Sequence, residues 1–84
     1  MPATWWLAIT DNGDGTFMVT AHQPQLNRLL TLDPAPRADE LRAVLEALKV
    51  RAEFVEEVFA PPVKKLSNLE LWVEEETLRA HGFR

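Results

Sequence analysis

The 84 residues carry nine basic and thirteen acidic side chains, a formal net charge of -4, and no cysteine. This length fits one domain, and the missing cysteines exclude disulfides and thiolate metal sites. The negative charge disfavours nucleic acid because it repels phosphate. No apolar run approaches the ~20 residues of a membrane span, and the first residues lack the pattern of a secretory signal. We therefore expect a single cytoplasmic domain, residues 1–84, that does not enter a membrane.

The stretch from Thr4 to His22 predicts a β-hairpin, because two runs of strand-forming residues flank an Asn-Gly-Asp-Gly-Thr segment. This segment, residues 12–16, suits a type I turn in which Gly15 takes the left-handed position as a bulge. A longer loop shifts the partners by two positions and keeps the same faces. The shorter turn pairs Trp6 with His22, Leu7 with Ala21, Ala8 with Thr20, Ile9 with Val19, and Asp11 with Phe17.

The predicted hairpin is apolar on both faces, whereas a surface hairpin has one polar face. One face carries Trp5, Leu7, Ile9, Phe17, Val19 and Ala21. The other carries Trp6, Ala8, Met18, Thr20 and His22. The acidic turn does not fit a calcium loop, because EF-hand spacing would place Thr10 and Ala21 where Asp and Glu are needed. We expect neither a metal site nor a cofactor.

After the hairpin, the Leu-rich stretch from Gln23 to Leu32 is typical of either a short third strand or a helical turn. A helix is predicted next, with Asp33 as its cap and two prolines in its first turn. Its apolar positions follow a 3.6-residue period and should cover the Trp5 face of the hairpin. They are Ala38, Leu41, Val44, Leu45 and Leu48.

Two segments near the end of the chain fit both a helix and a strand. For residues 49–59 the Val and Phe content favours a strand, since a continued helix would be too long for this domain. Pro61 and Pro62 end it in either case. For residues 69–74, alternation favours a strand over the capping box that starts at Ser67. A short helix should follow from Glu75 to His81, with Gly82 at its C′ position and Phe83 folded back on Leu78.

Together these elements predict an α+β domain of the order ββαββα. A β-hairpin, a helix, a second β-hairpin and a short C-terminal helix would build a small antiparallel sheet of four or five strands. The main helix would cover one face of this sheet.

The second hairpin face then decides what the domain can do, because several large apolar groups on one surface usually mark a contact site. If the last strand joins the sheet, Trp72 can lie on the same face. Three things could cover this face: the terminal helix with Leu78 and Phe83, a second copy of the chain, or another protein. The predicted interface consists of Trp6, Ala8, Met18, His22 and Trp72.

We therefore expect a non-enzymatic interaction or regulatory domain that binds a protein partner, or itself as a homodimer, through this face. The alternative is a module that stacks single-stranded nucleic acid on sheet aromatics, although the basic residues of such modules are missing. An enzyme would need a site shared between subunits. The two histidines, His22 and His81, are far apart in the sequence, and Glu74 and Glu75 make only a weak constellation with His81. The single serine, Ser67, has no neighbouring base.

Overall fold

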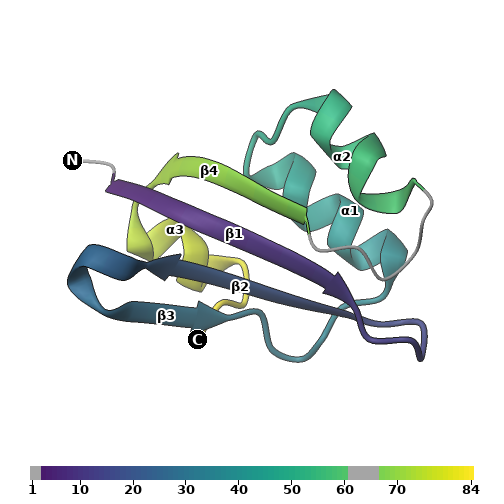
Figure 1. Ribbon diagram of the computed structural model, residues 1–84, viewed down its shortest axis with the longest axis horizontal. Helices are drawn as coiled ribbons and strands as arrows, with labels where there is room; N and C mark the ends of the chain where they lie inside the picture. The colour runs from purple at the N-terminus through teal and green to yellow at the C-terminus, as the bar shows by residue number, and fades with distance from the viewer. Residues whose placement is uncertain (1–2, 61–66) are drawn as a thin grey trace.

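The computed structural model describes residues 3–60 and 67–84. Its elements in chain order are β1 (Ala3–Asp11), β2 (Phe17–Gln23), the 3-10 turn η1 (Pro24–Leu26), β3 (Arg28–Thr31), α1 (Ala38–Ala47), α2 (Ala52–Phe59), β4 (Ser67–Val73) and α3 (Glu75–Ala80). The strands form one sheet in the order β3-β2-β1-β4, and every neighbouring pair is antiparallel (Figure 1). The predicted α+β class and four-stranded antiparallel sheet are confirmed, but the order of the elements differs from ββαββα.

The first hairpin has the predicted register, with Trp6 opposite His22 and Ile9 opposite Val19. The Asn12 N–H donates to the Thr16 carbonyl at 3.0 Å and closes the turn. Gly15 has a φ of +91°, as its predicted place in the bulge requires, and Gly13 also has a positive φ. Strand period and turn chemistry were therefore sufficient to place every side chain of this hairpin on its correct face.

The Gln23–Leu32 stretch contains both a helical turn and a short third strand, the two alternatives that the sequence left open. The chain makes a single 3-10 turn at η1, and Asn27, at a φ of +52°, then reverses its direction. Asn tolerates the left-handed region better than other non-glycine residues. From Arg28 onward the chain runs back along β2 as β3.

The predicted start of this helix is wrong, because α1 begins at Ala38, both prolines precede it, and Asp33 is not its cap. Arg37 is the N-cap residue, and its N–H donates to the Glu40 carboxylate at 2.9 Å. The Phe17 N–H donates to the Pro36 carbonyl at 2.9 Å, which holds the proline segment extended beside the hairpin.

The predicted strand over residues 49–59 is wrong, since this segment contains helix α2. Lys49 has a φ of +64° and breaks the helical run. The Lys49 N–H bonds the Glu46 carbonyl and the Val50 N–H bonds the Leu45 carbonyl, both at 3.0 Å, as in a Schellman cap. The chain forms two short helices in place of one long helix. A helix over residues 52–59 is therefore not too long for the domain, which was the reason for predicting a strand. The described residues therefore form no second hairpin.

Helix α2 is docked on α1 through one arginine. The Arg42 guanidinium donates to the Glu56 carboxylate at 2.7 Å and lies 4.8 Å from the centre of the Phe59 ring. Phe59 in turn meets Phe17 edge to face, with ring centres 5.5 Å apart. The buried Val55 faces the core from the same helix. The predicted break at Pro61 and Pro62 lies outside the described residues.

The last two elements agree with prediction. Residues 67–73 form β4, paired with β1 along its whole length, and α3 follows. The Phe83 N–H donates to the Leu78 carbonyl at 3.1 Å, and Gly82, at a φ of +98°, lies at C′. This is the predicted Schellman contact.

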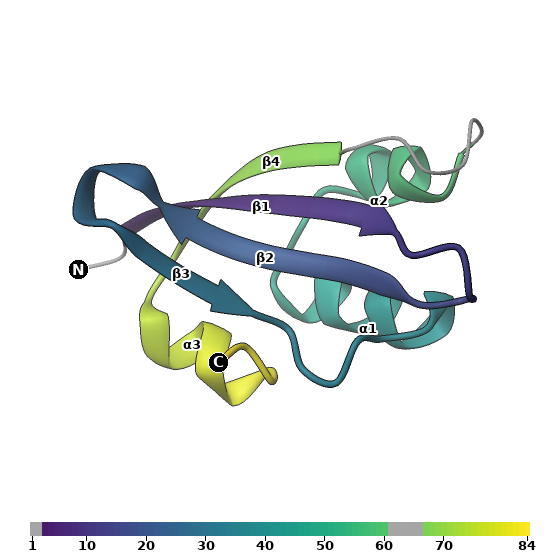
Figure 2. The ribbon, with the colours of Figure 1, turned by 60° about the horizontal axis from the view of Figure 1, so that its bottom comes forward.

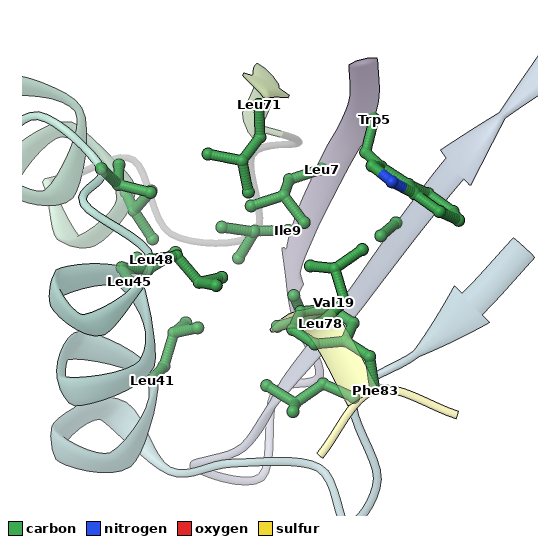
Figure 3. Close-up of a cluster of buried hydrophobic side chains, with 14 of the residues drawn as sticks. Trp5, Leu7, Ile9, Val19, Leu41, Leu45, Leu48, Leu71, Leu78 and Phe83 are labelled. Atoms are coloured by element: carbon green, nitrogen blue, oxygen red, sulfur yellow. The ribbon is translucent and has the colours of Figure 1, made fainter. Parts of the chain in front are cut away.

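All three helices lie on one side of the sheet (Figure 2). Leu41 and Leu45 of α1 and Leu78 of α3 point toward the same face of β1, the face that carries Trp5 (Figure 3). Ala38, expected in the apolar stripe of α1, is exposed. Since α3 and Phe83 pack into this core, they do not cover the Trp6 face, and that option is overturned. Within the described segments no helix is both long and apolar enough to span a membrane.

Candidate interaction surface

The second face of the sheet is open in the described part of the chain. Side chains at alternate positions of all four strands lie on this face, because strand side chains alternate with period 2. One row crosses the entire sheet, and its members are Leu29, His22, Trp6 and Glu70. The neighbouring row consists of Thr31, Thr20, Ala8 and Asn68.

Large apolar side chains on this face are exposed to an unusual degree. Trp6 is 40% exposed, Met18 50%, Leu29 63% and Trp72 65%. The adjacent residue Trp5, on the helix-covered face, is 1% exposed. Because exposed apolar groups gathered on one surface usually mark a contact site, this face is the candidate functional surface.

The structure places the predicted interface residues at two ends of the face. Trp6 and His22 are direct cross-strand neighbours, and Trp72 lies one diagonal step from Trp6, within reach of an aromatic side chain. Met18 lies opposite Thr10, four residues along the sheet from the Trp6 row, which is roughly 13 Å. Half-buried Ala8 lies between the two ends. Trp6, His22 and Trp72 form one cluster, which we call the indole cluster, and Met18 is separate from it.

Leu29 belongs beside the indole cluster but was not among the predicted site residues. It lies directly opposite His22 in β3. The alternation of exposed Leu29 with buried Leu30 and Leu32 is the strand signal that could have revealed it. The preceding 3-10 turn, which places Leu26 in the same run of leucines, obscured this alternation.

Hydrogen bonding fixes the edge of the indole cluster. The Trp72 Nε1–H donates to the Glu70 Oε1 at 3.2 Å along one side of β4. Glu70 is the single Asp, Glu, Lys or Arg that the described strands place on this face. The surface is therefore apolar with threonines between its large groups, while the charged residues of the chain are concentrated elsewhere.

The two carboxylates with a perturbed pKa lie away from this face. The Thr16 hydroxyl, followed by the Thr16 N–H, holds the pKa of the Asp14 carboxyl in the hairpin turn below its usual range. Hydrogen bonds from Arg79 and then from Arg28 hold the pKa of Glu75 on α3 below its usual range. Both shifts belong to local turn or ion-pair structure.

Two further features lie outside the indole cluster. A concavity of about 380 Å³ lies beside Met18 and is lined also by Asn12, Leu32 and Arg84. His81 caps α3, and its Nδ1 lies 2.8 Å from the Thr77 carbonyl oxygen. Residues 3–60 and 67–84 contain no group of three or more His, Asp or Glu side chains arranged to hold a metal ion.

Comparisons with protein-family models, with curated proteins and with solved structures find no match to this chain. A role can therefore be argued only from the surface itself.

Proposed function

We propose that this chain is a small non-enzymatic interaction or regulatory domain that binds a protein partner, or a second copy, through its open sheet face. One observation carries this proposal. Of the five large apolar side chains that are exposed in the described residues, four lie on the same face, while all helices pack on the other. The exception is Leu26 in the 3-10 turn.

The indole cluster has the properties of an interface anchor. Each tryptophan can bury a large area at low cost in side-chain entropy, and tryptophans near the centre of an interface dominate its energy. The one carboxylate on the face, Glu70, already accepts a hydrogen bond from Trp72. A partner that covers this end must therefore also supply a group that balances the negative charge of Glu70.

A catalytic role has less support on this face. His22, which could act as a general base, lies between Trp6 and Leu29 in its row rather than beside a polar group that would orient its ring. His81 lies on α3, on the opposite side of the sheet. An enzyme would still require a second subunit to supply the remaining groups.

Single-stranded nucleic acid remains the second candidate, because exposed indoles on an open sheet can stack bases. The phosphates would find no arginine or lysine among the strand residues of this face. Arg28 of β3 instead pairs with Glu75 of α3, across the sheet from the open face. Fluorescence anisotropy with a labelled oligonucleotide at low salt tests this candidate, and binding weakened by a Trp6→Ser substitution would favour it over a protein partner.

The leading proposal is tested by quantitative affinity capture with purified variants. Trp6→Ser and Trp72→Ser should lose the partner proteins that the wild type retains. Leu26→Ser is the matched control, because Leu26 is 67% exposed but lies outside the face. Circular dichroism checks that all variants fold. If both tryptophan variants retain every partner of the wild type, the face is not the binding surface.

A further inference from the structure

The two edges of the sheet differ in how they are closed. At the β3 edge the Thr31 N–H donates to the Arg84 carbonyl, and the Arg84 N–H donates to the Thr31 carbonyl, both at 2.8 Å. At the other edge β4 is the last strand in the sheet order, and the described residues supply no strand beyond it. Within residues 3–60 and 67–84, part of one edge is thus covered and the seven-residue edge of β4 has no strand partner.

The register shows which backbone groups of β4 point outward. The bond from Asn12 to Thr16 closes the hairpin, and residues of β1 alternate from there between β2 and β4. Ile9, Leu7 and Trp5 direct their N–H and C=O groups toward β4, and their partners there are Ser67, Leu69 and Leu71. The alternate residues of β4, which direct their backbone groups outward, are therefore Asn68, Glu70 and Trp72.

This edge carries few of the features that normally block strand addition, and Glu70 is its one charged side chain. Proteins protect exposed edges with proline, lysine, a bulge or a very short strand. Residues 67–73 contain no proline or lysine, and β4 pairs with β1 one to one over seven consecutive positions without a bulge. In both ribbon views β4 is the outermost strand, and α2 lies near the end where it starts (Figures 1 and 2). The half that ends at Val73 is the more open half.

We propose that β4 pairs antiparallel with β4 of a second copy across a two-fold axis, joining two sheets into one of eight strands. The outward backbone N–H and C=O groups of one β4 must face those of the other. The two-fold axis must therefore pass through one residue position, such as Glu70 or Leu71, and not between two positions. An axis at Glu70 sets two carboxylates directly opposite each other, which is destabilising. An axis at Leu71 sets Glu70 opposite Trp72 of the partner subunit, and Trp72 opposite Glu70 of the partner subunit.

The Leu71-centred register is complementary in both backbone and side chains. Each Glu70–Trp72 pair across the axis exchanges two N–H···O=C bonds. The Trp72 indole already donates to the Glu70 carboxylate within one chain, so the same two groups are compatible neighbours between chains. An axis at Leu69 would instead move the partner strand toward the end of β4 where α2 lies.

Edge pairing also enlarges the open face, although it does not depend on what covers that face. From a strand spacing of ~4.8 Å and a rise of ~3.4 Å per residue, one face spans about 450 Å². This is near half of the ~800 Å² that each partner contributes to a standard interface. Because a two-fold axis perpendicular to the sheet keeps all helices on one side, the two open faces join and reach that size.

Sedimentation velocity across a concentration series is the first test. The wild type should form dimers as its concentration rises, and Glu70→Pro should weaken association at least about tenfold because it removes an outward N–H without affecting the ladder to β1. Leu29→Pro is the matched control, since the Leu29 N–H points away from β2 at the other edge. A wild type that stays monomeric, or a Glu70→Pro variant that dimerises normally while folded, overturns the proposal.

Disulfide trapping tests the register with substitutions that leave the backbone N–H groups in place. The chain has no cysteine of its own, so only the introduced cysteines can cross-link. A mixture of Glu70→Cys and Trp72→Cys chains should cross-link more than either alone, since facing Cα atoms lie ~5.5 Å apart in such a pair. The Leu71-centred register would be contradicted if Glu70→Cys chains cross-linked mainly with one another. It would also be contradicted if the mixture gave no more cross-linked dimer than Leu26→Cys gives. Trp6→Ser separates the two proposals: it should lose the partner of the open face and keep the edge dimer.

Discussion

Trp5 and Trp6 are neighbours in β1 and lie on opposite faces of the sheet, with exposures of 1% and 40%. Trp5 contacts the core beneath the helices, and its Nε1 has no hydrogen-bond partner in the described residues. Trp5 therefore contributes through packing. Trp6 contributes little to the core and is available for contact.

The first prediction compares alanine substitutions at these two neighbours. Trp5→Ala should cost about 3–5 kcal/mol, since it leaves a cavity among the buried side chains. A loss of this size approaches the whole stability of a small domain. Trp6→Ala should cost below about 1 kcal/mol, as is typical of exposed positions. Urea denaturation followed by circular dichroism measures both, and a larger loss at Trp6 would reverse the assignment of the faces.

The second prediction concerns the glycine that ends α3. An alanine at position 82 would adopt an unfavourable φ near +98°, and its Cβ would lie 3.2 Å from Cδ1 of the buried Leu32. We expect Gly82→Ala to cost about 1–2 kcal/mol or more. Gly15→Ala is the control, because its φ is similar but its close neighbour is the movable end of Arg37. Equal losses would show that the contact with Leu32 has no effect.

The third prediction concerns Lys49, the non-glycine residue that separates α1 from α2. Its left-handed conformation costs about 1–2 kcal/mol, whereas glycine accepts it at an entropic cost of about 0.5–1 kcal/mol. Lys49→Gly should therefore raise the free energy of unfolding by roughly 0.5–1 kcal/mol. Lys49→Ala removes the charge without relieving the backbone and should be nearly neutral. Thermal denaturation compares the two, and destabilisation by glycine would argue against this helix break.

The fourth prediction concerns the acid limb of stability. Glu75 accepts from Arg79 Nε at 2.8 Å and also pairs with Arg28, so its pKa is depressed in the folded state. The stabilisation is complete above the ordinary glutamate pKa of about 4.3 and is lost as the pH falls through the lower folded value.

Glu75→Gln should accordingly be less stable than the wild type at neutral pH and should lose less stability on acidification. The exposed neighbour Glu76 provides the control substitution, Glu76→Gln. Unfolding curves between pH 7 and pH 2 measure the difference. Parallel pH profiles for Glu75→Gln and the wild type would contradict a depressed pKa in the folded state.

Local patterns were sufficient for most elements. Alternation and turn residues predict the hairpin register, and helical spacing predicts α1. The Leu78, Gly82 and Phe83 spacing predicts the cap of α3 because a Schellman motif is defined within six residues. The same alternation places Trp6, Ala8, Met18, His22 and Trp72 on one face.

Local patterns gave the wrong element where the backbone conformation of a single residue decides between a helix and a strand. At Lys49 a left-handed residue without glycine turns the chain, and no sequence signal indicates it. Residues 52–59 then become a helix that packs on α1 through Arg42, a contact between residues fourteen positions apart. The Val and Phe content of these residues favoured a strand, because composition does not register the contact with α1.

The sequence by itself determined the α+β class, the apolar character of both hairpin faces and the side of the sheet on which each of their residues lies, because these follow from the period of the chain. Only the tertiary structure decided that α1 and α3 pack on the same side, since that depends on which buried surfaces meet. It thereby left the Trp6 face open and showed that β4 ends the sheet.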